Sequence, residues 1–286
     1  MMPRPGARFE DPRGRAGAPG HAAVVGFHHA GRPEACDELC GAGFLSALYS
    51  LGPAATLGLD VPADFGRTHL FSNAEAAFQA LRFWPRAAQF KSLNGVEALR
   101  RAKQLSETVK REQEEDDDPR SFGGFGGAWP AMFAVLRAKF PRGSHMARTL
   151  AKTRDAFLLE HAPEAGWEPR WSDSGDGEGM NWRGAQLMLI RDELQGTRDW
   201  TDLIETLMDL QTGRPHAPSK ARRWREAVRR ASRALAEQLG EHHGGHPAAD
   251  EPVASQAQTA APRTSAAGAA GDAVGALYGA VRLLAG

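Results

Sequence analysis

Apolar residues recur at helical spacing through the middle of the chain, and this pattern narrows the choice of folds. Between residues 73 and 84, Ala77, Ala80 and Leu81 share one helical face with Trp84, as in an amphipathic helix packed on a core. The same reasoning predicts helices at 96–112, 129–140, 144–159, 181–195, 199–211 and 219–239. Strands should be few and short, near 24–28 and 55–71. We therefore expect a mainly α fold with a few short strands.

The 286 residues divide by composition into a core and two ends. Residues 1–23 are rich in Pro, Gly and Arg and should form a disordered tail, because they bury too little apolar surface to offset ordering entropy. Residues 24–196 should form one compact domain, followed by a helical extension at 197–240. Residues 241–286 read as a low-complexity linker with a short apolar segment at the end. This C-terminal extension is a candidate surface for a protein partner.

Charge and composition exclude several classes of protein. The 35 basic and 35 acidic side chains balance, which gives no overall electrostatic attraction to nucleic acid. No run of about 18 apolar residues predicts a membrane helix, and the N-terminus lacks the apolar region of a secretory signal. The two cysteines at this spacing do not form a disulfide framework. We therefore predict a cytoplasmic protein without a membrane association.

Four blocks of sequence, in order, resemble the NADAR family of N-glycosidases. Phe44 to Tyr49 resembles the family's F-L-S-N-F-Y opening, and Ser72 to Ala80 resembles its S-x-E-H-A-F-Q-A block with one extra residue. Trp129 to Phe140 resembles the W...M...L-x-A-K-F helix. The last block runs from Leu150 to Arg191 and resembles L-x-x-T-x-x-x-x-L-x-E, W-G and G-x-N-x-x-G-x-x-L-M-x-x-R. The blocks cover about half of the chain.

The resemblance implies a NADAR-like domain that cleaves an N-glycosidic bond, with three departures from the family pattern. The family's asparagine in the first block is Ala47 here, and the histidine after its glutamate is Ala76. Its aspartate three residues before the tryptophan is Glu168. An altered substrate, a changed pocket or reduced activity would each fit these departures.

The candidate catalytic residues are Glu75 and Glu168. Cleavage of a C–N glycosidic bond builds positive charge on the ribose, which a carboxylate stabilises, and the departing base needs a proton. Glycosidases commonly use two carboxylates for this purpose. Each residue also has a simpler interpretation: Glu75 could close a capping box with Ser72, and Glu168 could be a solvated loop acid.

The candidate substrate-binding residues come from the same blocks, and each has an alternative structural role. Trp129 and Trp171 could stack on a base or line the sugar site, although Trp129 could equally begin a core helix. Asn181, at a predicted helix start, could help bind a phosphate or be an ordinary N-cap. Lys139 could pair with phosphate or lie on an exposed face. Ser46 and Tyr49 could form the pocket wall or belong to the core.

The resemblance implies hydrolysis of a phosphoribosyl or ADP-ribosyl small molecule, without a metal or other cofactor. Phosphorylated intermediates of riboflavin synthesis are one substrate class that the family suggests. Cys36 and Cys40 with His28 and His29 match known zinc patterns poorly. A non-catalytic module that binds ADP-ribose or a nucleotide is the main alternative.

Overall fold

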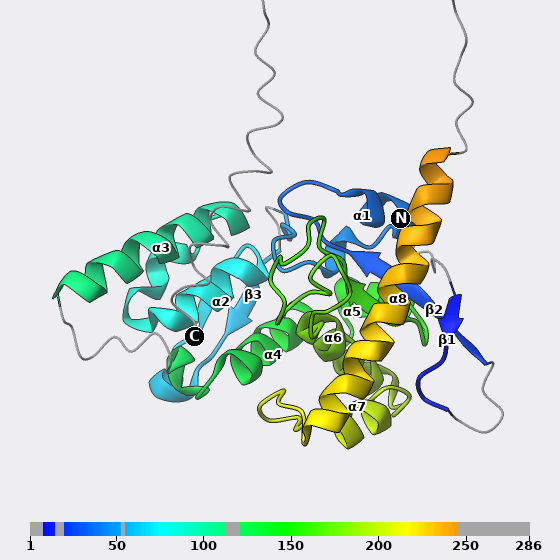
Figure 1. The fold of residues 1–286 in the computed structure, drawn as a ribbon. Helices are drawn as coiled ribbons and strands as arrows, with labels where there is room; N and C mark the ends of the chain where they lie inside the picture. Colours follow the sequence, from blue (N-terminus) through cyan, green and yellow to red (C-terminus); the bar gives the residue numbers. More distant parts are fainter. Residues whose placement is uncertain (1–7, 15–19, 53–54, 113–120, 245–286) are drawn as a thin grey trace, which may run out of the picture.

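The computed structural model describes residues 8–14, 20–52, 55–112 and 121–244 (Figure 1). Within these residues, one sheet has the strand order β1-β2-β5. Its strands are β1 (Arg8–Glu10), β2 (His21–Phe27) and β5 (Phe157–Glu160). β1 is antiparallel to β2 and β5 is parallel to it, which places Phe27 opposite Glu160. A separate antiparallel pair consists of β3 (Leu57–Leu59) and β4 (His69–Phe71).

Helices make up most of the described chain, which confirms the predicted mainly α class. The α-helices are α1 (Ala35–Cys40), α2 (Ala74–Arg82), α3 (Gly95–Glu112), α4 (Ala128–Lys139), α5 (His145–Ala151), α6 (Trp182–Gln195), α7 (Thr201–Leu207) and α8 (Pro218–Gly244). Short 3₁₀ segments are η1 (Gly43–Leu45), η2 (Pro62–Asp64), η3 (Trp84–Phe90) and η4 (Phe122–Gly124). α4 packs against both α2 and α6, and α6 packs on β5. None of the described helices combines the length and apolar composition that crossing a bilayer requires.

The predicted disordered tail at 1–23 is wrong for the part that the structure describes. Residues 8–10 form β1, and Phe9 is buried with its ring 5.5 Å from that of Phe157. The guanidinium of Arg13 lies 4.3 Å from the ring centre of Trp200. These two side chains anchor a segment whose average composition is typical of disorder. Residues 1–7 and 15–19 lie outside the described part.

The helix predicted at 144–159 is also partly wrong. α5 ends at Ala151, Arg154 follows with a positive φ of 54°, and residues from Phe157 onward form β5. All four residues of β5 are buried. A short apolar run of this kind fits a strand covered on both faces as well as a buried helix, so periodicity could not separate the two.

α8 belongs to the same packing unit as the sheet. It contacts β1, β2 and β5, and Figure 1 shows it crossing the front of the sheet. Trp224 and Leu235 of α8 are fully buried in the common core. The predicted boundary at residue 196 therefore does not coincide with a break in packing. The helix reaches Gly244, and the predicted linker and apolar segment beyond it lie outside the described residues, so the expected partner contact there stays a prediction.

Candidate active site

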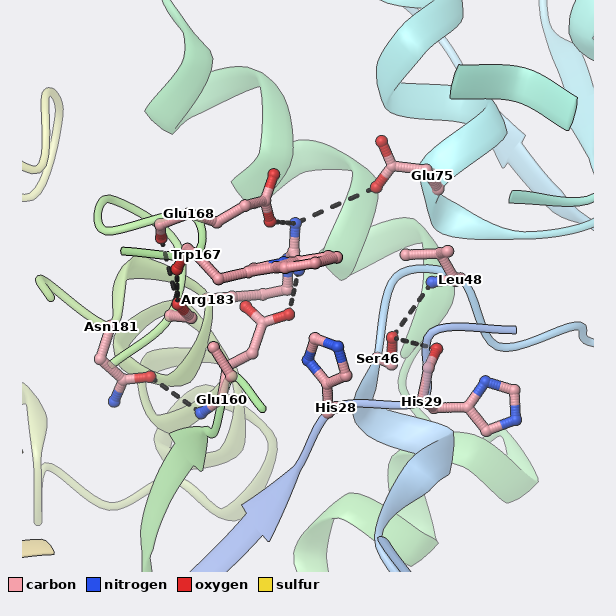
Figure 2. A network of polar contacts seen from close by, with 12 residues as sticks. His28, His29, Ser46, Leu48, Glu75, Glu160, Trp167, Glu168, Asn181 and Arg183 are labelled. Carbon is pink, nitrogen blue, oxygen red and sulfur yellow. Dashed lines mark hydrogen bonds and ion pairs between the residues drawn. The ribbon is translucent and has the colours of Figure 1, made fainter. Parts of the chain in front are cut away.

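Arg183 is the centre of a buried cluster of three carboxylates (Figure 2). Its Nη1 donates a hydrogen bond to Oε1 of Glu160, while its Nη2 lies 4.0 Å from Oε2 of Glu75 and 3.9 Å from Oε2 of Glu168. The Glu75 side chain is 1% exposed, that of Glu160 3% and that of Glu168 17%. Charges at this depth persist when they are paired. One guanidinium thus draws together acids from α2, the end of β5 and the following loop.

Glu75 points into this cluster from the first turn of α2. Its backbone N–H donates to the carbonyl of Ala47, and its Oε1 accepts a hydrogen bond of 2.7 Å from Nε2 of Gln79. The predicted capping box with Ser72 is wrong, because Asn73 is the N-cap and accepts from the N–H of Ala76. With Asn73 as the cap, the carboxylate of Glu75 is left to face Arg183.

Asn181 fixes the relative position of β5 and α6. Its Oδ1 accepts from the N–H of Glu160 at 3.0 Å, and its Nδ2 donates to the carbonyl of Leu158 at 2.8 Å. The residue is fully buried with a φ of 46°. The predicted phosphate site needs free backbone N–H groups at this helix start, whereas those of Trp182 and Arg183 donate to the carbonyls of Arg170 and Trp171, so the phosphate-binding role stays a prediction. Asn181 positions Glu160 and Arg183.

Substitution of Gly184 should disturb the contacts by which Asn181 joins β5 to α6. A Cβ at Gly184 would lie 2.1 Å from the carbonyl oxygen of Leu158 and 2.5 Å from the amide of Asn181. We expect Gly184→Ala to lower the free energy of unfolding by roughly 1–3 kcal/mol, as overpacking commonly does. Gly240→Ala is the matched control, since nothing lies within 4 Å of that helical glycine, and it should be neutral or slightly stabilising. Urea unfolding of both variants measures this, and an equally stable Gly184→Ala protein would contradict it.

Glu168 and Trp171 approach Arg183 from the loop between β5 and α6. Glu168 has a φ of 42°, an uncommon conformation for a residue with a Cβ. Its carbonyl accepts hydrogen bonds from the N–H groups of Trp171 and Ser172, which hold that conformation. The Trp171 ring is half-buried, 5.3 Å from the Arg183 guanidinium. The structure thus brings Glu75, Glu168 and Trp171 together around Arg183.

Lys139, Ser46 and Tyr49 form a second buried group beside the cluster. Nζ of Lys139 donates to the carbonyl of Ser46 at 2.6 Å and lies 5.8 Å from the ring centre of Tyr49. Burial holds the pKa of Lys139 well below its usual value, and Arg183 lowers it further, although Glu160 raises it. The Ser46 hydroxyl donates to the carbonyl of His29. These contacts make Lys139 and Ser46 supports of the 43–49 segment, while half-buried Tyr49 is nearer the surface.

Trp129 lies in the core rather than among the carboxylates. It is 2% exposed, and its Nε1 donates to the carbonyl of Leu210 at 2.8 Å. Its ring meets that of Trp182 edge to face at 5.2 Å. The alternative interpretation, that Trp129 begins a core helix, therefore describes its position, and its contact with a substrate stays a prediction.

Sequence reasoning missed Glu160 and Arg183 as site residues. Both lie in the fourth block, where Glu160 ends an apolar run and Arg183 follows Asn181 by two positions. Burial raises the pKa of Glu160 to about 7, and Glu75 and Asp173 act in the same direction, although Arg183 lowers it. The sequence signal that could have found Glu160 is a charged residue at the end of an apolar run. A charge at such a position is buried, and charged side chains are rarely buried without a partner.

His28 was considered for zinc but not for the catalytic site. It follows β2, is 6% exposed, and both of its ring nitrogens lack a hydrogen-bond partner among the described residues. Burial lowers its pKa to about 4, with Arg183 and His161 adding to the effect. In Figure 2 the ring of His28 is drawn near the side chains of Glu160 and Trp167. His28 is therefore a neutral imidazole at the edge of the site.

A surface cavity of about 450 Å³ lies elsewhere, between α4, α6 and α7. Its apolar wall includes Phe125, Phe133 and Leu189. None of the carboxylates around Arg183 lines it. Since the paired acids are the chemically distinctive groups, the cluster and not this cavity is the candidate active site.

The fold and the cluster define a class: a mainly α domain with buried acids gathered around one arginine. No family model matches the chain. A 61-residue stretch is 39% identical to a riboflavin biosynthesis protein of Vibrio vulnificus, covering 21% of this chain and 16% of that protein. The chain thus corresponds to a small part of this relative.

The solved NMR structure of the E. coli protein YbiA is also similar. It is 21% identical, covers 60% of this chain and 84% of its own, and superposes with a TM-score of 0.39. The match to the riboflavin protein supports the resemblance that the four sequence blocks indicate. The chain therefore resembles these proteins over part of its length.

Proposed function

We propose that this chain is an N-glycosidase that hydrolyses the C–N glycosidic bond of a ribose-phosphate or ADP-ribose-type substrate. The observation that carries the proposal is the convergence of Glu75, Glu160 and Glu168 on Arg183. Carboxyl groups held close together in a dry site are pushed into different protonation states. Glycoside cleavage needs one ionised carboxylate and one proton donor, and a cluster of this kind supplies both.

Glu75 is assigned to the sugar and the attacking water. As the bond to the base breaks, positive charge develops on the ribose, and an ionised carboxylate beside it lowers the energy of that state. The same group can accept a proton from the water that attacks the anomeric carbon. Trp171 offers an aromatic face beside Arg183 for a flat base, and Glu168 provides a further carboxylate from the loop.

The substrate class comes from the resemblance and from the relative's name. A riboflavin biosynthesis protein is 39% identical over the matched stretch, which favours phosphorylated riboflavin intermediates among ribose-phosphate compounds. ADP-ribosyl compounds present the same C–N bond. Because both classes carry a ribose, a base and phosphate, one experiment can compare them.

The test is a substrate panel assayed for released products. The full chain is incubated with ribosylamino-pyrimidine phosphates and with ADP-ribosylated compounds, and the free base and ribose phosphate are separated and quantified. We expect catalytic release from one of the two classes. Binding without release from either class would contradict the proposal.

A non-catalytic binding module is the second candidate, and the departures from the family pattern near Glu75 favour it. Glu75 is 1% exposed, and the family's polar groups at two nearby positions are replaced by buried Ala47 and Ala76. Under this alternative, the chain binds ADP-ribose or a related nucleotide tightly without turnover. Calorimetry with wild type and Glu75→Gln then gives equal affinities, whereas the enzyme predicts that loss of the carboxylate changes turnover.

A further inference from the structure

The two carboxyl oxygens of Glu160 differ in their hydrogen bonding. Its Oε1 accepts from Arg183, whereas its Oε2 is buried and has no hydrogen-bond partner among the described residues. A buried carboxyl oxygen without a partner is costly. This arrangement fits a carboxyl group whose Oε2 is protonated and donates that proton to a ligand.

Burial and the neighbouring acids favour the protonated form of Glu160. The titratable and charged groups around it are Glu75 of α2, Lys139 of α4, Arg183 of α6, His28 after β2, and His161, Glu168 and Asp173 of the loop after β5. Burial raises the pKa of Glu160 to about 7 even with Arg183 beside it. At neutral pH the carboxyl is therefore protonated in a substantial fraction of molecules.

The neighbouring imidazole is less suited to this role. The pKa of His28 is lowered to about 4, chiefly by burial, so the ring is neutral near pH 7 and holds no readily released proton. A carboxylic acid with a pKa close to the working pH is a more effective proton donor. Glu160 is therefore a carboxyl group in this cluster that can carry a proton near neutral pH.

Building on the proposed N-glycosidase activity, we propose that Glu160 is the proton donor to the departing base. The C–N bond breaks with its electron pair moving to nitrogen, and that nitrogen takes the proton from Oε2 of Glu160. Water forms the new C–O bond, and its proton goes to Glu75. The base and the free sugar are the products, and a later proton exchange with solvent restores both carboxyl groups.

The experiment compares Glu160→Gln with the matched variant Glu168→Gln on two ribosides. One substrate has a basic nitrogen leaving group, and the other has a nitrophenolate that departs without being protonated. For the basic substrate, we expect Glu160→Gln to lower kcat by about 10²–10⁴-fold, with a much smaller loss for the nitrophenyl riboside. The wild-type rate should fall as pH rises through about 7, since the donor must be protonated, and this limb should vanish in Glu160→Gln but persist in Glu168→Gln.

Equal losses on both substrates, or a pH limb that remains in Glu160→Gln, would overturn the assignment. If Glu160→Gln does not fold, Glu160→Asp is measured instead. That variant keeps a carboxyl group, so it should retain the pH limb at a reduced rate, and loss of the limb would contradict the assignment. Wild-type turnover of the basic substrate separates the two proposals. If the wild type does not turn it over, the N-glycosidase proposal is rejected. If it does, and Glu160→Gln has the same leaving-group dependence as wild type, only the assignment of Glu160 as proton donor is rejected.

Discussion

Replacing Arg183 with methionine is expected to destabilise the folded protein by about 3–5 kcal/mol near pH 7.5, the usual cost of breaking a buried ion pair. Arg183 is 2% exposed and faces Glu75, Glu160 and Glu168. Without the guanidinium, these carboxylates repel one another in a dry environment, so each must be protonated or solvated. Chemical denaturation of the variant and wild type at a fixed pH measures the difference.

The same variant should show a distinctive pH dependence. Burial already raises the pKa of Glu160 to about 7, and in Arg183→Met it should rise further because the guanidinium that lowers it is gone. Stability is then retained at low pH, where Glu160 is neutral, and is lost as pH rises through its raised pKa. The loss relative to wild type should therefore shrink between pH 7.5 and pH 5. Arg198→Met, which removes an exposed pair with Asp202, should change little at either pH, and an equal loss for Arg183→Met at both pH values would contradict this account.

Truncating Trp224 to alanine is expected to cost about 3–5 kcal/mol of stability, as for other large buried aromatic side chains. Trp224 is fully buried on α8, and its Nε1 donates to the carbonyl of Met180 at 2.7 Å. Its ring lies 5.7 Å from that of Phe157 in β5. The side chain therefore joins α8 to both the sheet and the site loop.

The control for this prediction keeps an aromatic ring at position 224. Trp224→Phe loses the hydrogen bond to Met180 but retains most of the apolar contact, so its loss should be clearly smaller. Thermal unfolding of both variants gives the comparison. A Trp224→Ala protein as stable as wild type would contradict the view that this side chain joins α8 to the sheet and the site loop.

The loop that carries Glu168 is tied to α8 at further points. The hydroxyl of Ser232 donates to Asp173 at 2.7 Å, and Arg229 forms hydrogen bonds to both oxygens of Glu178. Asp173 in turn contacts His161, the residue after Glu160. The C-terminal helix thus helps to set the geometry of the site, a role that amphipathic periodicity alone does not indicate.

Local patterns predicted the long helices well. α2, α3, α4 and α6 each begin and end within a few residues of the predicted ranges, because their apolar faces repeat at helical spacing over several turns. The resemblance supplied Glu75, Glu168 and Trp171, which do lie together. These are the features that short-range sequence information encodes.

Contacts between distant segments could not be predicted in the same way. Phe9 lies in β1 because that segment pairs with β2, and its ring packs on that of Phe157 from β5. Asn181 bonds to β5 because α6 begins beside that strand. The partnership of Arg183 with three acids depends on α2, β5 and a loop meeting at one point. Such encounters depend on tertiary packing, which overrides local preference.

The most direct test of the account measures single-turnover release of ribose phosphate by wild type, Glu75→Gln and Glu97→Gln. Glu97 also lies in the first turn of a helix, but it is exposed and closes a capping box with Asn94. The account predicts a loss of about 10³-fold or more in Glu75→Gln, the scale of removing a catalytic carboxylate, with Glu97→Gln unchanged. A Glu75→Gln protein that is folded and releases product at the wild-type rate would contradict the central claim.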